Sequence, residues 1–288
     1  MRIGVTFPQN EITADPIAVR DYAQAAEGLG YAHLLAYDHV IGADITARPD
    51  WRPGAYTIDS LFHEPFVLFG YLAGLTQLLE FVSGVIILPQ RQTVLVAKQA
   101  VEVDVLSGGR FRLGVGVGWN AVEYEALNER FADRGKRSEE QIALLRRLFT
   151  ERSVTFAGQH HTVNAAGLNP MPVQRPIPIW IGGSVEATLK RVAAIGDGWF
   201  PQMLPGPEAA DAVARLRAYT QAAGRDPVSI GIEARVSIGK KSPDDWRREV
   251  EGWREIGATH LTVNTMNAGL TDPQAHIAAI RRFWEAVS

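Results

Sequence analysis

Short apolar runs and longer amphipathic stretches alternate along the chain. The run from Phe81 to Leu88 is continuous and is followed by Pro89, which is typical of a strand buried on both faces. In the next stretch, 93–106, apolar residues recur at helical spacing and form one stripe. A second apolar strand follows, over 111–118. Two strands joined by a helical crossover form a parallel βαβ unit, so this central part of the chain predicts a parallel sheet.

Eight strand–helix units of this kind account for the chain. The predicted strands cover 2–7, 33–37, 81–88, 111–118, 177–181, 199–200, 228–236 and 259–263. The predicted helices cover 16–29, 64–78, 93–106, 134–150, 185–195, 207–222, 243–256 and 273–287, with a further helix beginning near Ala121. The pattern predicts a single (β/α)8 barrel over residues 1–288. An open doubly wound sheet is the alternative, and it is disfavoured because no G-x-G-x-x-G motif follows the first strand.

Glycines and irregular stretches mark the connections. Gly30, Gly196 and Gly257 each follow an apolar residue just before a predicted strand, where glycine commonly ends the preceding helix. The stretch 40–63 is long, polar and irregular, and a loop of this length in a compact domain is usually functional or mobile. The stretch VTFAGQHHTVN predicts a hairpin on a barrel loop, with its two histidines at the surface.

Composition excludes several classes of protein. The chain has 288 residues, of which 46% are hydrophobic and 21% are charged, as in an ordinary globular protein with a large core. It contains no cysteine, which excludes disulfides, thiolate catalysis and zinc–thiolate sites. A net charge of −3 gives no sign of a nucleic-acid partner. No apolar run approaches a membrane span, and the first residues do not resemble a signal peptide, so we expect a cytoplasmic protein.

Three alternating glycines distinguish the strand predicted at 111–118. Gly114, Gly116 and Gly118 point to the same face, and glycine is kept in a strand where another group comes very close to the backbone. That group is either a neighbouring layer of a barrel interior or a flat ring lying over the strand end. Trp119 and Asn120 follow directly, and Asn120 can cap the helix that begins near Ala121.

The stretch LSGGRFRLGVGVGW resembles the central signature of the luciferase-like monooxygenase superfamily. The chain is most similar to the branch of small actinobacterial oxidoreductases that use the deazaflavin coenzyme F420. Weaker matches extend over AEGLGYAHLLAYDHV and PIPIWIGGSVEATLKRVAAIGDGWF. The resemblance implies a (β/α)8 barrel that binds coenzyme F420, with FMN as the alternative cofactor.

His39 is the candidate catalytic residue. Active sites of such barrels lie at the C-terminal ends of the strands, and His39 is the only histidine directly after a predicted strand. Histidine changes its charge near neutral pH and therefore suits acid–base work. The alternative is a structural loop histidine bonded to Asp38 or to the backbone. The resemblance places the stretch YDHV on the aspartate–histidine position of the family, which favours the catalytic interpretation.

The candidate cofactor site combines a glycine turn with a strand segment. Gly182, Gly183 and Ser184 lie between a strand and a helix, where backbone N–H groups can hold a phosphate, or they form a plain turn with Ser184 as the helix cap. By resemblance, a cis peptide that supports the ring would fall at Gly84-Val85; the alternative is an ordinary strand glycine. The predicted cofactor-binding residues are Asp38, Gly84, Val85, Gly116, Gly118, Trp119, Asn120, Gly182, Gly183 and Ser184.

One position departs from the family. Some relatives carry a catalytic glutamate directly after the glycine strand, and here that position is Trp119. Glu123 lies four residues on and can simply favour the helix dipole, so the proton-donor role of those relatives is not carried over. No cluster of lysine and arginine indicates a phosphorylated substrate, and no convergent set of Asp, Glu and His indicates a metal.

The expected function is hydride transfer between coenzyme F420 and a small organic substrate. One rival is an FMN-dependent monooxygenase on the same fold, and another is a flavin-binding protein without turnover. The resemblance also implies a homodimer through early helices. The apolar stripe Phe66, Phe69, Leu72 and Leu75 can serve such an interface, or it can pack against the barrel, which we favour.

Overall fold

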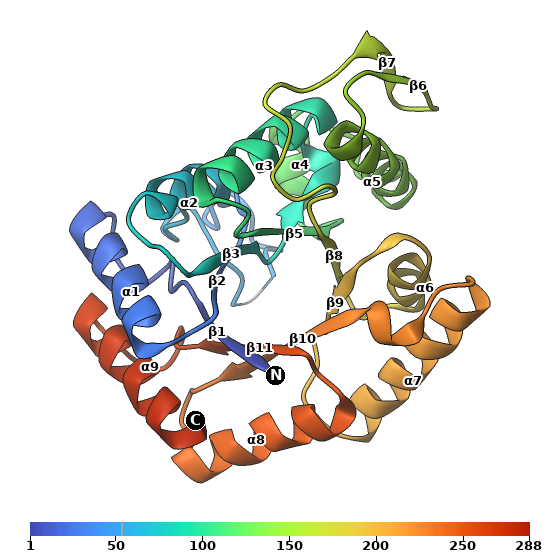
Figure 1. Cartoon of the computed structure of the whole chain (residues 1–288). Helices are drawn as coiled ribbons and strands as arrows, with labels where there is room; N and C mark the ends of the chain where they lie inside the picture. Colours follow the sequence, from blue (N-terminus) through green and yellow to red (C-terminus); the bar gives the residue numbers. More distant parts are fainter. Residues whose placement is uncertain (53) are drawn as a thin grey trace.

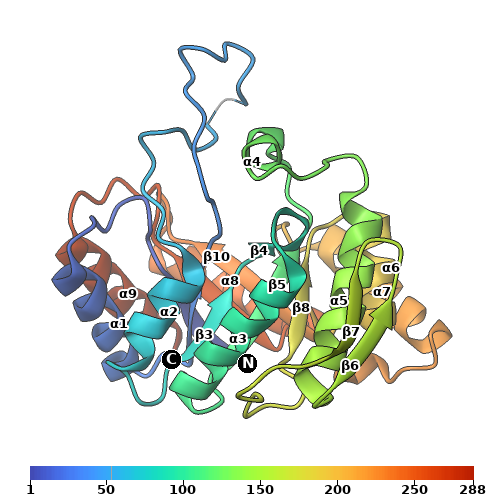
Figure 2. The same cartoon turned by 90° about the horizontal axis from the view of Figure 1, so that it is seen from above.

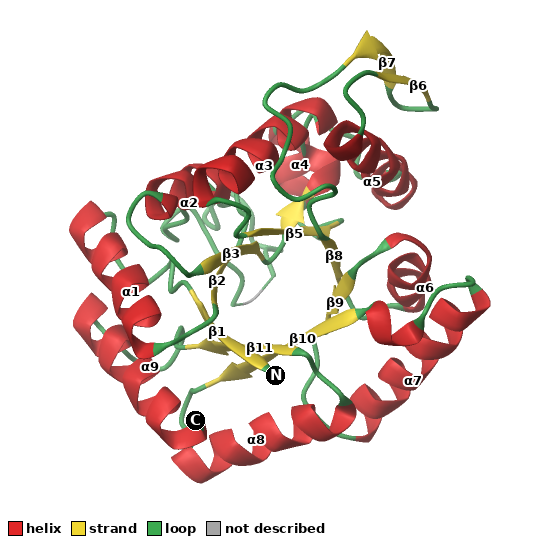
Figure 3. Ribbon diagram, in the orientation of Figure 1, coloured by secondary structure: helices red, strands yellow, loops and turns green. Residues whose placement is uncertain are grey.

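A closed ring of eight parallel strands, surrounded by helices, forms the core of the protein (Figure 1). The computed structural model describes residues 1–52 and 54–288. The barrel strands pair in the order β1, β2, β3, β5, β8, β9, β10 and β11, and β11 pairs back with β1. Figure 3 shows the strands as an inner ring with the helices outside it. The predicted (β/α)8 barrel is confirmed.

The elements follow one another in the predicted alternation. The strands are β1 (Arg2–Thr6), β2 (His33–Ala36), β3 (Glu80–Ser83), β4 (Ile86–Ile87), β5 (Phe111–Gly116), β6 (Val154–Ala157), β7 (Thr162–Ala166), β8 (Ile179–Gly182), β9 (Gly198–Phe200), β10 (Gly231–Ser237) and β11 (His260–Asn264). The α-helices are α1 (Pro16–Leu29), α2 (Pro65–Ala73), α3 (Thr93–Ser107), α4 (Ala121–Ala126), α5 (Arg134–Thr150), α6 (Glu186–Ile195), α7 (Pro207–Ala222), α8 (Pro243–Ile256) and α9 (Pro273–Val287). Short 3₁₀ helices cover Leu88–Gln90 and Pro227–Ser229.

Several predicted boundaries are corrected. Helix α2 ends at Ala73 instead of residue 78, because the Arg110 side chain donates to the carbonyl oxygens of Ala73 and Thr76 and closes the turn there. The strand predicted at 228–236 begins only at Gly231. Gly30 and Gly257 adopt the left-handed conformation expected past a helix end, whereas Gly196 is extended. The hairpin predicted around VTFAGQHHTVN is confirmed as β6 and β7, which lie outside the barrel beside α5 (Figure 1).

The apolar stripe of α2 belongs to the core. Phe66, Phe69 and Leu72 are at most 5% exposed and pack within the main hydrophobic cluster, with Leu75 partly buried against it. This stripe therefore packs against the barrel and offers no dimer surface, as we favoured. The homodimer itself stays a prediction.

No helix in the described residues combines the length and the apolarity that crossing a membrane requires.

The third barrel strand is interrupted, so the continuous strand predicted over 81–88 is wrong. The chain leaves the strand after Ser83, passes through a cis peptide between Gly84 and Val85, and resumes pairing at Ile86. The pairing with β5 shifts by one residue across this interruption, from Val82 opposite Arg112 to Ile86 opposite Val115. The cis peptide is the one that the family resemblance implied.

Glycines of β5 give this interruption its space. The Ser83 hydroxyl accepts the Gly114 N–H and donates to the Gly114 carbonyl, both at 2.9 Å, so it replaces the missing backbone pair. A Cβ on Gly114 would lie 1.9 Å from the Ser83 carbonyl oxygen, and one on Gly116 would lie 2.6 Å from the Val85 side chain. Of the two alternatives for these glycines, a neighbouring barrel layer therefore accounts for the close approach. Gly118 lies beyond the end of β5 with a φ of +63°, so its predicted place on the strand is wrong.

A layer of paired charges fills one end of the barrel interior. The Glu233 carboxylate accepts from Arg112 at 2.6 Å and contacts His33 Nε2 at 2.8 Å, while Arg112 and Arg2 both pair with Glu80. Burial alone would raise the pKa of Glu233, but Arg112 and His33 lower it to about 2. The charge of Glu233 therefore stabilises the fold at neutral pH, and this contribution is lost as the pH falls from the ordinary glutamate range toward 2.

The opposite end of the barrel carries the long connections. Figure 2 shows that the segment after β2 and helix α4 rise from the same end, away from both chain termini. The strands run toward this end, so it is the C-terminal face of the barrel, where sites in this fold are found.

We predict that Gly114→Ala destabilises the protein strongly. Its Cβ would overlap a backbone oxygen, which cannot move without disturbing β3, and overpacking of this kind costs about 3 kcal/mol or more. Gly70→Ala is the matched control, since Gly70 lies in α2 with no atom within 4 Å of the added Cβ, and alanine favours a helix by about 1 kcal/mol. Calorimetric melting should show a large loss for the first variant and none for the second. Equal melting temperatures would contradict the packing described here.

Candidate active site

One pocket of about 500 Å³ opens at the C-terminal face of the barrel. Every residue predicted for the site lines it: Asp38, His39, Gly84, Val85, Gly116, Gly118, Trp119, Asn120, Gly182, Gly183 and Ser184. These residues come from the ends of the second, third, fourth and fifth barrel strands. The structure thus brings the predicted set together, and the function of each residue has to be argued from its contacts.

His39 faces Glu123 across one wall of the pocket. His39 Nδ1 lies 3.3 Å from Glu123 Oε1, and the same oxygen accepts the Val40 N–H at 3.0 Å. Gln90 donates to the other oxygen of Glu123 at 3.3 Å. The Glu123 side chain is 1% exposed, whereas His39 is 19% exposed. Glu123 is therefore a buried partner of His39 and does more than favour the dipole of α4.

Glu123 stays ionised at neutral pH in this setting. Burial would raise the pKa of Glu123, but the hydrogen bonds from His39, Gln90 and the Val40 N–H hold it below the ordinary glutamate value. An ionised carboxylate only accepts hydrogen bonds, so Nδ1 of His39 carries a proton. The Nε2 atom, which makes no hydrogen bond within the described residues, is then the ring nitrogen available to a ligand.

Asp38 holds the backbone around the strand interruption and makes no hydrogen bond to His39. Its carboxylate accepts the Ile87 N–H at 3.0 Å and pairs with the Arg91 guanidinium at 2.7 Å. Arg91 also pairs with Glu64. The alternative in which His39 is bonded to Asp38 is therefore wrong, because the Asp38 oxygens are turned to Ile87 of β4 and to Arg91, which precedes α3. Asp38 fixes the position of the segment that follows Val85.

The turn at 182–184 leads into an uncapped helix. Trp199 donates to the Gly183 carbonyl, and the Ser184 hydroxyl accepts the Gln202 N–H. The N-cap of α6 is Val185, which makes no capping bond from its side chain, so the alternative in which Ser184 caps the helix is wrong. Gly183 has a φ of +130° and a Cβ there would meet Thr188 at 3.0 Å. The uncapped start of α6 lies at the pocket, since Val185 and Thr188 line it, and uncapped N–H groups at a helix start can hold an anion.

An aromatic cluster lies beside the pocket, and Trp119 is its member that lines it. The Tyr56 ring packs at a tilt against His39 with ring centroids 3.7 Å apart, and its hydroxyl accepts from Asn120 at 2.6 Å. Asn120 also caps α4 by accepting the Val122 N–H, as predicted. Trp119 is 39% exposed and packs against Trp51 and Tyr56. The Asn120 amide therefore has its hydrogen-bond partners within the protein, whereas Trp119 lines the pocket with the Arg52 guanidinium over its ring.

The sequence analysis missed several cationic or polar side chains of the pocket, among them one tyrosine and two arginines. Tyr37, Arg134 and Arg235 all line it. The rule that selects residues directly after a strand does not select Arg235, because Arg235 lies within a predicted strand. The sequence pattern that could have identified Arg235 is its spacing from Glu233, because residues two apart on a strand such as β10 point to the same face.

The histidines of the hairpin lie apart from this pocket. The predicted surface position is only partly right, since both are half-buried. His161 Nδ1 contacts Glu140 and its Nε2 contacts Thr93, each at 2.8 Å, so it ties the hairpin to α5 and α3. Within residues 1–52 and 54–288, no group of three or more His, Asp or Glu side chains is placed to hold a metal ion.

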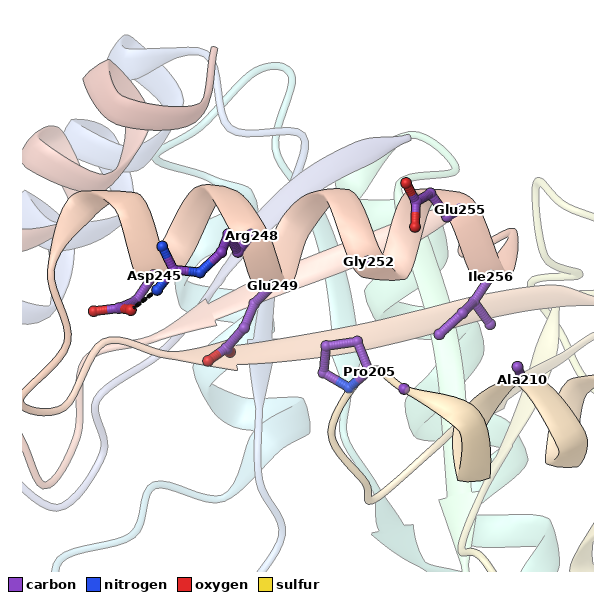
Figure 4. Close-up of a pocket in the computed structure, with 9 residues that line it drawn as sticks. Pro205, Ala210, Asp245, Arg248, Glu249, Gly252, Glu255 and Ile256 are labelled. Carbon is purple, nitrogen blue, oxygen red and sulfur yellow. Dashed lines mark hydrogen bonds and ion pairs between the residues drawn. The ribbon is translucent and has the colours of Figure 1, made fainter.

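A second hollow of about 510 Å³ lies between α7 and α8 on the outer wall (Figure 4). Asp245 and Arg248 of its lining pair with one another, and Glu249 pairs with Lys241. None of the predicted site residues lines this hollow. It therefore plays no part in the candidate site.

The sequence profile of the luciferase-like monooxygenases matches residues 1–284. The chain belongs to this family. An uncharacterized luciferase-like relative from Mycobacterium tuberculosis is 35% identical over 272 residues, 92% of each chain. The F420-dependent hydroxymycolic acid dehydrogenase of the same organism is 26% identical and is matched over 99% of this chain and 80% of its own. The FMNH(2)-dependent dimethylsulfone monooxygenase of Pseudomonas putida is 32% identical over 48% of this chain and 39% of its own.

Solved structures of luciferase-like proteins share the fold. The F420-dependent secondary alcohol dehydrogenase in complex with an F420-acetone adduct superposes with a TM-score of 0.79 at 16% identity, over 100% of this chain and 99% of that one. At this identity the likeness establishes the barrel and its topology only.

We predict that Asp38→Asn loosens the site by destabilising the fold. The variant leaves Glu64 as the one remaining carboxylate partner of the Arg91 guanidinium. Loss of the charge from a buried pair of this kind lowers the free energy of unfolding by about 2 kcal/mol. Asp59→Asn is the control, because Asp59 is exposed and its side chain makes no hydrogen bond within the described residues. Urea unfolding compares the two variants with the wild type. An Asp38→Asn protein as stable as the Asp59→Asn protein would contradict this role of Asp38.

Proposed function

We propose that this protein is an oxidoreductase that transfers a hydride between coenzyme F420 and a small organic substrate. The observation that carries the proposal is one pocket that combines a phosphate cradle, a ring platform and a single histidine. The family supports an oxidoreductase, and the F420-dependent relative matched over 99% of the chain favours the deazaflavin.

The described residues fit a deazaflavin with a phosphate-bearing side chain. Gly182, Gly183 and Ser184 would hold the phosphate with the uncapped start of α6. Gly84 and Val85 would support the ring, since Val85 packs against the apolar barrel interior and its side chain fills the space left by Gly116. When bound, the coenzyme supplies a two-electron hydride donor or acceptor.

His39 moves the proton that accompanies the hydride. Its Nδ1–H is held by Glu123, which leaves Nε2 to accept a proton from a substrate hydroxyl in oxidation or to return it in reduction. Glu123 stabilises the charged imidazolium and acts through His39 as a positioning residue. Tyr56 packs against both His39 and Trp119, and Trp119 adds an aromatic surface to the pocket lining.

The cofactor is tested by titration. We predict that coenzyme F420 binds more tightly than FMN by about tenfold or more, a difference of about 1.4 kcal/mol. Quenching of the fluorescence of Trp119 and the other tryptophans measures both affinities on the same sample. Tight binding of FMN without any binding of F420 would reverse the proposal in favour of an FMN-dependent monooxygenase, which the Pseudomonas putida relative represents. Binding with no substrate-dependent redox change across a substrate screen would indicate a flavin-binding protein without turnover.

The acid–base assignment is tested by two variants. We predict that His39→Ala lowers turnover by about a hundredfold or more while F420 affinity stays within about tenfold of the wild type. Glu123→Gln keeps His39 but removes its anionic partner, so turnover should fall by about tenfold to a hundredfold. His160→Ala is the control, because His160 lies outside this pocket. Full turnover of His39→Ala with normal cofactor binding would make His39 a structural loop residue.

A further inference from the structure

Arg235 is an inward-facing cation one layer above the charge pairs of the barrel interior. It lies two residues after Glu233 on β10, so both side chains point to the same face. Glu233 is buried, whereas Arg235 is exposed and lines the pocket. The strand therefore places one exposed guanidinium at the pocket, on the barrel-mouth side of Glu233.

No carboxylate of the described residues forms an ion pair with Arg235. Both oxygens of Glu233 are occupied, by His33 and by Arg112. The two carboxylates that line the pocket are also engaged, since Asp38 pairs with Arg91 and Glu123 lies against His39. The charge of Arg235 is thus left uncompensated.

The layer beneath Arg235 is balanced without it. Arg2 and Arg112 face Glu80 and Glu233 in that layer, so two cations meet two anions. Arg134, the other arginine of the pocket, donates to the Phe131 carbonyl and lies over the Phe131 ring. Arg235 is therefore a pocket cation that structural pairing does not explain.

The guanidinium is held in place by a neutral partner. Arg235 Nη1 donates to the Tyr37 hydroxyl at 3.1 Å, across the barrel mouth from β10 to the end of β2. Tyr37 is fixed in turn, because its backbone N–H donates to Gln9 at 2.6 Å and its side chain packs with Val85 against the inner apolar cluster. The remaining N–H groups of Arg235 make no hydrogen bond within the described part of the chain. They form a positioned donor set beside the proposed ring platform.

We propose that Arg235 binds a carboxylate of the substrate, so that this enzyme acts on an organic acid. The inference rests on the proposed function, because it takes the surface at Gly84 and Val85 as the place of the deazaflavin ring. A planar guanidinium matches a carboxylate with two parallel hydrogen bonds. The cofactor phosphate has its own proposed site at the start of α6, so it does not need Arg235. Arg235 then holds the carboxylate of the substrate while the reacting carbon of the substrate faces His39.

The test uses benzoate and benzamide as probes of equal shape and different charge. F420 affinity is measured first on each sample, and isothermal titration with each probe then follows on the F420-loaded protein. The variants are Arg235→Gln, which removes the charge, and Arg281→Gln, which removes an exposed arginine of α9 outside the pocket. Tyr37→Phe keeps Arg235 but removes its hydroxyl partner.

We expect the wild type and Arg281→Gln to bind benzoate more tightly than benzamide by about tenfold or more. Arg235→Gln should abolish this difference and leave F420 affinity unchanged, while Tyr37→Phe should reduce the difference only in part. The proposal is overturned if benzoate has no advantage in the wild type, or if the advantage survives in Arg235→Gln. It is also overturned if Arg235→Gln weakens F420 binding instead, which would assign the anion to the cofactor. A wild type that fails to bind F420 at the first step contradicts the proposed function separately.

Discussion

The close contact between the interrupted third strand and β5 is the constraint on which the site depends. The Ser83 hydroxyl forms hydrogen bonds with both the N–H and the carbonyl of Gly114, and no side chain fits between the two strands at Gly114. The pairing then resumes one residue out of register, which turns Gly84 and Val85 toward the barrel mouth. The glycines of β5 thus give the backbone of the Gly84–Val85 segment its room.

Neighbouring strand ends fix the Gly84–Val85 segment from two sides. The Asp38 carboxylate accepts hydrogen bonds from the Ile87 N–H and from the Arg91 guanidinium. These bonds connect the segment after the interruption of the third strand to the end of β2. His39, the next residue, is turned the other way and meets Glu123 of α4. These adjacent residues therefore have different contacts: the Asp38 carboxylate holds the backbone, and His39 Nε2 makes no hydrogen bond within the described residues.

Much of the fold and the position of the candidate site could be predicted from the sequence, because both depend on local patterns. Strand and helix periodicity predicted the barrel, and the rule that sites follow the strand ends selected His39 and the turn at Gly183. Glu123 and Arg235 could not be assigned in this way. The partner of Glu123 lies 84 residues away, and the importance of Arg235 depends on Glu233 being occupied by other strands. Such facts arise only when the barrel closes.

The most direct test of this account is a crystal structure of the protein with coenzyme F420. We expect the deazaflavin ring to lie against Gly84 and Val85, with its phosphate at the start of α6 and His39 Nε2 beside the space left for substrate. A ring bound elsewhere, or one whose reactive edge is separated from His39 by the platform itself, would contradict the account.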